Sequence, residues 1–384
     1  MAKTYTALGL MSGTSMDGVD VSIIKSDGEH EYSTILDEYF EYSKDLYEEL
    51  LSVRNKIFSK KDLEIHSKEL KHVEREITLF HAKAVNQILN KLKIEIDFIG
   101  FHGQTIFHNP ANKISKQLGD GQLLSQLTKK IVIYNFRQND LKNGGQGAPL
   151  TPIFHNVMTN KINDIYKIKF PISVLNIGGI SNITNTVNKK DILKNKINAY
   201  DIGPGNCLID DWIRNNSKKK YDDGGSIAQS GNTNMLTLNQ ALENFDISSY
   251  DKSLDIKDFD ISFARGLSIE DGASTITDYS AILIAKGINE ANISNAPSKV
   301  KWLVCGGGRK NKYLIDRIKN DKTIFNNIFL EPVEKYGVDG DFVESQAFGY
   351  LAIRSYLRLP ITFKSTTGCK EVLGCTGGVL VKNY

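Results

Sequence analysis

The chain has 384 residues, of which 40% are hydrophobic and 24% charged, with 48 basic residues against 45 acidic ones. This composition excludes a fibrous or disordered chain, and the length exceeds what one hydrophobic core usually serves, so we expect two domains with a ligand cleft between them. The net charge of +3 is small and no basic stripe with interleaved aromatic residues occurs, which argues against a nucleic-acid surface.

The cysteines and the apolar runs predict a reduced, cytoplasmic protein. The four cysteines form no C-x-x-C pair and accompany no plausible set of histidine ligands, so neither a disulfide framework nor a zinc site is indicated. The first residues lack the apolar region of a signal peptide, and the best apolar run, 279–285, is too short to cross a bilayer. We therefore expect no membrane association.

The first predicted elements are two strands, 5–11 and 19–25, joined by a turn rich in glycine, hydroxyl and acidic residues. Gly13 and Gly18 can bring backbone N–H groups close to an anion, and Ser12, Thr14 and Ser15 add hydroxyl donors. Asp17 and Asp20 could reach a metal-bound water. The pattern fits a phosphate-binding hairpin; an ordinary hairpin turn with common turn residues is the alternative.

The region 44–92 is charged and periodic, which predicts helices, and 96–101 predicts a short strand that ends at His102. His102, Gln104 and Thr105 offer donors and acceptors suited to sugar hydroxyls, although a lone histidine is often structural. A further strand, 130–136, leads to Arg137. Its guanidinium could hold a carboxylate with two hydrogen bonds, or form a surface salt bridge.

The middle of the chain predicts a second hairpin, formed by strands 172–177 and 180–186 with Gly178 and Gly179 at its tip. Strand 198–202 precedes a Gly-Pro-Gly turn, after which Asn206 is expected to cap helix 207–214. Asp201 therefore lies near a strand end. A carboxylate at such a position can serve as a general base beside bound phosphates, or merely accept hydrogen bonds within an Asx-turn.

Strand 299–305 runs into the glycine turn 306–308, with helix 311–319 behind it, and another glycine turn lies at 337–341. Strands that alternate with helices indicate an α/β fold with ligands at the carboxyl ends of the strands. Glu344 opens the helical stretch 347–357, where a carboxylate can accept from a sugar hydroxyl, orient a water or only cap the helix. Together, the glycine turns suggest two facing domains that hold a polyphosphate.

Long, ordered motifs carry a family resemblance that covers the chain almost end to end. They lie at 9–20, 101–108, 136–152, 175–184, 200–206 and 303–308, with further matches at 339–348 and 367–374. The sequence resembles the anhydro-N-acetylmuramic acid kinases, bacterial cell-wall recycling enzymes of the actin-like ATPase superfamily. The resemblance implies two actin-like (ribonuclease H-like) domains with a cleft between them. We place the first at 1–135 plus 345–384 and the second at 136–344.

The resemblance also implies the reaction. In this family, the enzyme uses ATP and Mg²⁺ to convert 1,6-anhydro-N-acetylmuramic acid. An aspartate base activates the water that opens the anhydro bridge, and the freed O6 takes the γ-phosphoryl group. Asp201 matches that base and Glu344 a cleft glutamate, while His102, Gln104, Thr105 and Arg137 match the pocket for the sugar and its lactyl carboxylate. The positions matching the nucleotide site are Ser12, Gly13, Thr14, Ser15, Met16, Asp17, Gly18, Val19 and Asp20, the tip Gly178 and Gly179, and the adenosine turn Gly306, Gly307 and Gly308.

Some questions stay open at this point. Within 248–261, relatives usually carry an arginine where Lys257 stands, and a lysine cannot form the same bidentate contact. The residues that hold Mg²⁺ are not identified, and a homodimer is left open. Two alternative functions are an ordinary sugar or acid kinase of the same superfamily, which hydrolyses no bond, and a nucleotide-dependent sensor without turnover.

Overall fold

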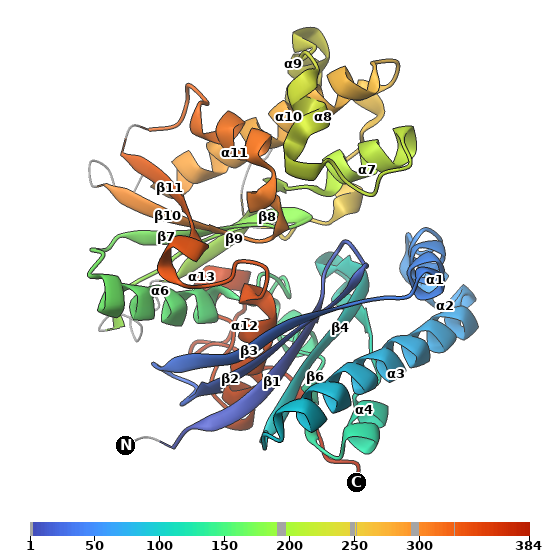
Figure 1. Ribbon diagram of the computed structural model, residues 1–384, viewed down its shortest axis with the longest axis vertical. Helices are drawn as coiled ribbons and strands as arrows, with labels where there is room; N and C mark the ends of the chain where they lie inside the picture. Colours follow the sequence, from blue (N-terminus) through green and yellow to red (C-terminus); the bar gives the residue numbers. More distant parts are fainter. Residues whose placement is uncertain (1–2, 190–196, 246–249, 251, 293–298, 326) are drawn as a thin grey trace. The chain divides into compact units, whose positions relative to one another are not determined.

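The computed structural model describes residues 3–189, 197–245, 250, 252–292, 299–325 and 327–384. Contacts within it divide the chain into two compact units, which are considered separately. Unit 1 lies within Met1–Lys161, Lys189–Ile197 and Phe342–Tyr384, and unit 2 lies within Ile162–Asn188 and Asn198–Asp341. Each unit is built around one β-sheet with helices packed against it (Figure 1).

The sheet of unit 1 has the strand order β12-β6-β4-β1-β2-β3, and β5 pairs with β4 outside this path. The strands β1, β2 and β3 form an antiparallel meander, whereas β1, β4 and β6 are parallel to one another. The bounds are β1 (Tyr5–Ser12), β2 (Gly18–Ser26), β3 (Tyr32–Glu41), β4 (Phe98–Asn109), β5 (Ile114–Leu118), β6 (Ile131–Tyr134) and β12 (Val379–Val381).

Helices cover both faces of this sheet. Leu8 and Leu10 of β1 belong to one apolar core with residues of α1 and α3. The opposite face carries Gly9, where a Cβ would lie 1.9 Å from the carbonyl oxygen of Ser345, so α12 rests directly on the strand backbone. The helices that begin in unit 1 are α1 (Lys44–Arg54), α2 (Lys60–Ile65), α3 (Ser67–Leu92), α4 (Gly121–Thr128), α5 (Gln138–Lys142), α6 (Pro152–Tyr166), α12 (Val343–Tyr356) and α13 (Lys364–Thr367), with the 3₁₀ turn η1 (Pro110–Asn112).

The sheet of unit 2 has the order β11-β10-β7-β8-β9. Its strands are β7 (Ile172–Ile177), β8 (Ile180–Asn185), β9 (Asn198–Pro204), β10 (Val300–Cys305) and β11 (Ile328–Pro332). A core formed with the long helix α10 covers one face. The helices are α7 (Cys207–Asn216), α8 (Ser226–Ser230), α9 (Met235–Glu243), α10 (Ile269–Asn292) and α11 (Lys312–Lys319), with 3₁₀ turns η3 (Asp223–Gly225), η4 (Ile256–Asp258), η5 (Ser262–Ala264), η7 (Gly307–Lys310) and η8 (Val333–Tyr336).

The two sheets share one topology. Counted along each unit, the main strands follow the order 3-2-1-4-5, with strands 1 to 3 antiparallel and strands 1, 4 and 5 parallel. The same pattern of directions holds for β7 to β11. This repeated arrangement is that of a ribonuclease H-like fold, and it confirms the predicted α/β class with two such sheets.

The structure divides the chain at other positions than the predicted 135 and 344. Residues 136–161 belong to unit 1 because Phe136 packs on Phe348 and Phe154 packs on Tyr32, with ring centroids 5.3 Å and 4.9 Å apart. Glu344 also belongs to unit 1, since that unit resumes at Phe342.

Three local expectations need correction. Strand β3, which the sequence pattern did not indicate, extends the first hairpin into a meander. The strand expected to end near Phe101 continues to Asn109, because β5 supplies a hydrogen-bonding partner for its second half. Strand β9 likewise runs through Pro204, so Asp201 lies inside a strand.

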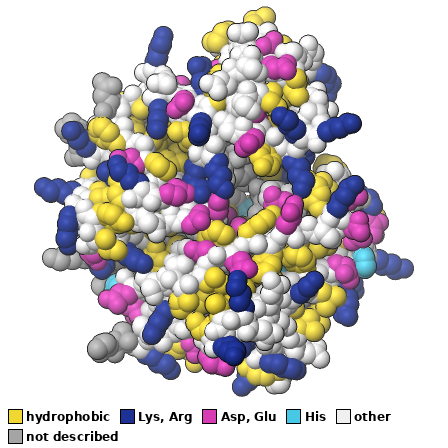
Figure 2. Space-filling view, in the orientation of Figure 1, with side chains coloured by type: hydrophobic (Ala, Val, Ile, Leu, Met, Phe, Trp, Pro, Cys, Tyr) yellow, Lys and Arg dark blue, Asp and Glu magenta, His cyan; other side chains and the backbone are white. Residues whose placement is uncertain are grey.

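Charged side chains are distributed without a single-sign stripe on the face seen in Figure 2, where Lys and Arg alternate with Asp and Glu. Within the described ranges, no helix is long and apolar enough to cross a membrane. The four cysteines are buried and free of disulfide bonds.

Candidate functional site

The predicted phosphate hairpin of unit 1 is a turn of residues 13–17 between β1 and β2. The N–H of Met16 donates to the carbonyl of Gly13 at 3.2 Å and closes the turn. Met16 and Val19 are buried in the apolar core, so their side chains cannot touch a ligand in this turn. Thr14 and Ser15 are exposed at the tip. The hairpin therefore offers hydroxyl and backbone groups at its tip.

Buried hydrogen bonds fix the base of this hairpin. The hydroxyl of Ser12, 1% exposed, lies 2.6 Å from Oε1 of Gln104 and 2.9 Å from the carbonyl of Gly18, to which it can donate. The phenol of Tyr42 donates to the same hydroxyl at 3.1 Å, and Nε2 of Gln104 donates to the carbonyl of Gly13 at 3.0 Å. We call these residues, Ser12, Tyr42 and Gln104, the hairpin anchor.

The hairpin anchor changes the interpretation of two predicted site residues. Both ends of the Gln104 amide are bound to the hairpin, although its match in the family pocket predicted a contact with sugar. Ser12 is likewise committed within the protein. Tyr42 was missed, because its position after β3 gives no local signal; burial raises the pKa of its phenol, which therefore stays a donor. Acidic Asp17 accepts from Ser15 at 2.6 Å beside the anchor.

Two predicted sugar-pocket residues, His102 and Arg137, are in direct contact. Nδ1 of His102 lies 2.7 Å from the carbonyl of Gly103, so that nitrogen carries the proton, and Nε2 accepts from Arg137 at 2.9 Å. Nη1 of Arg137 donates to the carbonyl of Gly147 at 2.7 Å. Burial and the charge of Arg137 hold the pKa of His102 well below its usual value. The imidazole is therefore neutral and orients the guanidinium, while Thr105 nearby in sequence accepts from Gln117 at 3.2 Å.

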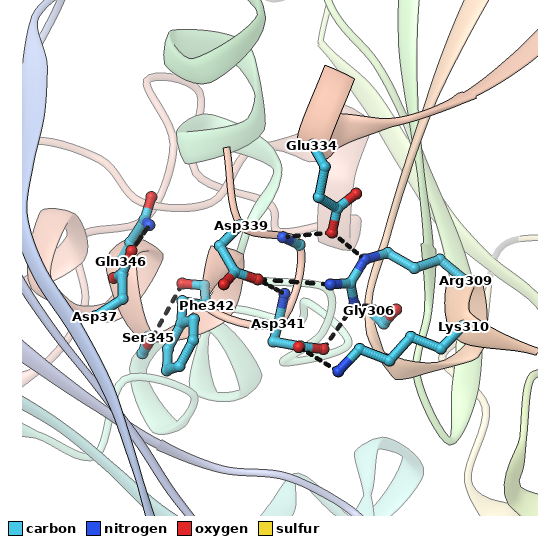
Figure 3. Close-up of polar contacts among 11 residues, drawn as sticks. Asp37, Gly306, Arg309, Lys310, Glu334, Asp339, Asp341, Phe342, Ser345 and Gln346 are labelled. Carbon is cyan, nitrogen blue, oxygen red and sulfur yellow. Dashed lines mark hydrogen bonds and ion pairs between the residues drawn. The ribbon is translucent and has the colours of Figure 1, made fainter. Parts of the chain in front are cut away.

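Glu344 lies in the first turn of α12, as predicted. The neighbouring residues fasten this turn to the sheet of unit 1. The hydroxyl of Ser345 lies 2.6 Å from that of Ser22, and Nε2 of Gln346 donates to Asp37 of β3 at 3.0 Å. Figure 3 shows Gln346 and Asp37 side by side. These contacts fix the start of the helix, and with it the backbone position of Glu344.

In unit 2, the tip Gly178–Gly179 packs against the start of α7. The N–H of Asn206 donates to the carbonyl of Gly178 at 2.9 Å, and the N–H groups of Gly205 and Cys207 donate to that of Gly179. The predicted cap by the Asn206 side chain is wrong, since this side chain makes no capping bond. The carbonyls of the tip thus face the helix start.

Asp201 is 6% exposed within β9, directly opposite Asn182 of β8. The backbone N–H of Leu254 donates to its Oδ2 at 2.9 Å. A carboxylate held by a fixed donor keeps one orientation, which suits a general base. Leu254 belongs to the region where the family pattern changes; Lys257 of the same region is exposed, in η4.

The predicted adenosine turn, Gly306–Gly308, follows β10 and packs onto the end of β7. Gly306 has a φ of +79°, and a Cβ there would lie 2.3 Å from Oδ1 of Asn176. At Gly308, a Cβ would lie 2.1 Å from Cγ2 of Ile177. Gly307 is different: it is exposed and nothing lies within 4 Å of its would-be Cβ. Packing explains the first and third glycines of the turn and leaves the second unexplained.

Gly13 and Gly178 share this property with Gly307. Each has a φ outside the left-handed region, and a Cβ would meet nothing closer than 3.9 Å at Gly13 and 3.5 Å at Gly178. Elsewhere, as at Gly205 or Gly272, a Cβ would collide with neighbouring atoms. The unit 1 hairpin, the Gly178–Gly179 tip and the Gly306–Gly308 turn therefore each hold a glycine that neither conformation nor packing requires.

The comparisons with known proteins agree with the motifs. The profile of the family described as "Anhydro-N-acetylmuramic acid kinase" matches residues 5–380. The chain belongs to this family. A curated anhydro-N-acetylmuramic acid kinase of Pelagibacter ubique is 53% identical over the full length of both chains, and one of Brucella canis is 37% identical over the full length of both. The chain is therefore a kinase.

Solved structures align along most of the chain at low identity. A hexokinase from Schistosoma mansoni complexed with glucose has 11% identity and a TM-score of 0.42, covering 91% of this chain and 85% of its own. An activator of 2-hydroxyisocaproyl-CoA dehydratase from Clostridium difficile with bound ADPNP has 11% identity and a TM-score of 0.43, covering 92% of this chain and 96% of its own.

One group of potential metal ligands occurs in the described part of this kinase. Asp140, Cys369 and Cys375 have ligand atoms within 4.8 Å of one another. The carboxylate already accepts from Thr362 and Thr367, and burial raises the pKa of the Cys375 thiol to about 12. The other oxygen of Asp140 accepts from the N–H of Gly147 at 2.7 Å, so both oxygens are bound within the protein and we interpret the group as part of the packed interior.

The hairpin anchor predicts that Tyr42→Phe loosens residues 13–17 without unfolding unit 1. The substitution removes one buried hydrogen bond worth about 1 kcal/mol and keeps the aromatic ring on Phe80. Amide hydrogen exchange read by mass spectrometry should quicken several-fold in the peptide containing residues 13–17. Exchange in the α3 peptide serves as the control and should not change. Equal protection of the hairpin in both proteins would contradict the anchor.

Proposed function

We propose that the chain uses ATP to phosphorylate 1,6-anhydro-N-acetylmuramic acid with hydrolytic opening of its anhydro ring, giving N-acetylmuramic acid 6-phosphate for peptidoglycan recycling. The observation that carries the nucleotide part is the set of unrequired glycines, Gly13, Gly178 and Gly307. At these positions, backbone conformation and packing would allow a small side chain, yet the residue is glycine. A ligand that lies close to the backbone would explain this choice.

The location of these glycines supports the same interpretation. Gly13 follows β1, Gly178 follows β7, and Gly307 is the second residue after β10. In sheets with parallel strands, ligands bind beyond the carboxyl ends of the strands. Backbone N–H groups there can bind phosphate oxygens without side-chain charge, which is what phosphoryl transfer requires.

Asp201 is the proposed base. In this proposal its carboxylate takes a proton from a water molecule, the water oxygen bonds to the anomeric carbon, and the bond from that carbon to O6 breaks. O6 then takes the γ-phosphoryl group and ADP leaves. The fixed donor from Leu254 supports the role, because its hydrogen bond to Oδ2 holds the Asp201 carboxylate in one orientation.

The sugar contacts proposed for unit 1 are those of Arg137, His102, Thr105 and Glu344. A guanidinium matches the geometry of the lactyl carboxylate, and the neutral His102 ring and the carbonyl of Gly147 hold Arg137 in one orientation. Glu344 can accept from a sugar hydroxyl. Gln104 is assigned to the hairpin instead of the sugar, because both ends of its amide are bound there.

Mg²⁺ fits this proposal as an ion carried by the nucleotide. It keeps several waters and enters phosphoryl-transfer sites through substrate phosphates and one or two carboxylates. Asp17 and Asp20 of the hairpin are the carboxylates that could bind its water, and the ion would neutralise charge on the phosphates. The same ATP dependence supports the predicted cytoplasmic location.

The reaction is tested by its mass balance. Incubation with ATP, Mg²⁺ and the anhydro-sugar should give a product heavier by one phosphoryl group and one water. Gain of the phosphoryl group alone would contradict ring hydrolysis and favour the ordinary kinase. Nucleotide binding without any product would favour the sensor.

Asp201→Asn should lower kcat by roughly 100-fold or more, because the amide cannot take the proton of water. ATP binding should survive, since the asparagine oxygen can still accept from Leu254. Asp211→Asn is the matched control: Asp211 is a partly exposed acid of α7 that pairs with Arg214 at 3.7 Å. Turnover by Asp201→Asn close to that of the control would disprove the assignment.

Gly307→Ala should raise the KM for ATP by roughly tenfold while leaving the melting temperature unchanged. The reason is that the added methyl group meets no protein atom but occupies the side on which a nucleotide would lie. Gly308→Ala provides the contrast and should lower the melting temperature by overpacking Ile177. Unchanged kinetics in Gly307→Ala would remove the principal support for nucleotide binding at this turn.

A further inference from the structure

Arg309 directly follows the adenosine turn, and its side chain is only 7% exposed. Figure 3 shows it extending from the end of that turn toward Glu334, Asp339 and Asp341, which come from the segment after β11. No sequence motif singled out this arginine. A buried charge that contacts several carboxylates restricts the geometry of every group it contacts.

The guanidinium binds both chain segments at once. Nε lies 2.5 Å from Oε1 of Glu334, and Nη1 lies 2.6 Å from Oδ1 of Asp341 and 3.0 Å from the carbonyl oxygen of Gly306. The contact between Nη2 and Asp339 is longer, at 3.5 Å. Arg309 therefore fixes the first peptide of the adenosine turn against residues 334–341.

Backbone hydrogen bonds reinforce the same link. The N–H of Gly306 donates to the carbonyl of Gly340 at 3.0 Å, and the N–H of Gly340 donates to Oε1 of Glu334 at 3.2 Å. A Cβ at Gly340 would lie 2.5 Å from Nε of Arg309, so this glycine allows the backbone to lie against the guanidinium. The two segments form one hydrogen-bonded unit, which we call the Arg309 clasp.

The charges of the clasp are closely balanced. Nζ of Lys310 lies 2.5 Å from Oδ2 of Asp341, so this carboxylate bridges Lys310 and Arg309. Burial by itself would raise the pKa of Asp341, but the hydrogen bonds from Arg309 and Lys310 lower it below its ordinary value, and the carboxylate stays charged. Without Arg309, several carboxylates beside the adenosine turn would lack their main cationic partner.

A purely structural role would not require this location. The ion pair between Arg317 and Asp278, which joins α11 to the 2%-exposed carboxylate on α10, stabilises the interior of the same unit without touching the turn. Arg309 instead contacts the carbonyl of Gly306, whose φ of +79° sets the course of the turn. Unit 1 contains a partial counterpart, since Arg137, which follows β6, contacts His102 within β4.

We propose that Arg309 is a positioning residue for the nucleotide: its fork holds Gly306–Gly308 in the binding conformation, and its charge keeps the neighbouring carboxylates from repelling a polyphosphate. This inference rests on the proposed nucleotide site at that turn. Arg309 acts through the backbone that it orients and does not contact the reacting atoms.

The test separates the shape of the fork from its charge. Arg309→Lys keeps the charge but loses the planar fork, and Arg309→Met loses both. We expect the KM for ATP and the dissociation constant for ADP, measured by calorimetry, to rise about tenfold in the lysine variant and further in the methionine variant. The kcat and the KM for the sugar should stay within about twofold, because the reacting groups are untouched.

Arg317→Lys is the matched control, since it weakens an ion pair to a buried carboxylate of the same unit, away from the turn. It should lower the melting temperature without changing the affinity for ADP. If Arg309→Met does not fold, Asp341→Asn tests the same clasp through a partly exposed residue and should weaken ADP binding several-fold.

The outcomes distinguish this inference from the proposed function. If the wild type binds no ADP, the nucleotide site itself is wrong. If the wild type binds ADP but the Arg309 variants bind it equally well, or no worse than Arg317→Lys, the positioning role is wrong. Wild-type affinity for ADP in Arg309→Lys would also overturn the role assigned to the planar fork.

Discussion

Parallel pairing of the first and fourth strands determines the placement of most candidate residues in this kinase. In unit 1, β1 pairs with β4, so the hairpin after β1 and the His102 segment emerge at the same edge of the sheet. In unit 2, β7 pairs with β10, which brings the Gly178 tip and the adenosine turn to one edge. Since both units repeat the strand order 3-2-1-4-5, each provides a hairpin beside a second turn.

In each unit, an arginine that follows strand 4 or strand 5 then contacts the neighbouring strand or the segment after it. Arg137 contacts His102 in unit 1, and Arg309 contacts Glu334 and Asp341 in unit 2. The partners differ in kind: one arginine is oriented by a neutral ring and a carbonyl, whereas the other is surrounded by carboxylates. The second arrangement balances the charge of its own arginine, in agreement with the positioning role proposed for Arg309.

The glycines show how one residue type serves separate physical purposes. At Gly9 and Gly100, the absence of a side chain lets α12 rest on the strand backbone of unit 1, since a Cβ would lie only 1.9 Å and 2.1 Å from carbonyl oxygens of the helix. At Gly306, a left-handed backbone and close packing both require glycine. At Gly13, Gly178 and Gly307, neither reason applies, and these positions carry the argument for a bound nucleotide.

The sequence alone determined the α/β class, both glycine-tipped hairpins, the start of the helix at Glu344 and membership of the family, because these depend on local patterns and on motifs in a fixed order. Only the tertiary structure decided what Gln104 and Tyr42 do, where the units divide and which glycines are free of packing. Those properties arise from contacts between residues far apart in the chain: Ser12 meets Gln104, and Arg309 meets Asp341. Local sequence patterns specify strands and turns, whereas the partner of a buried polar group is set by which strands become neighbours.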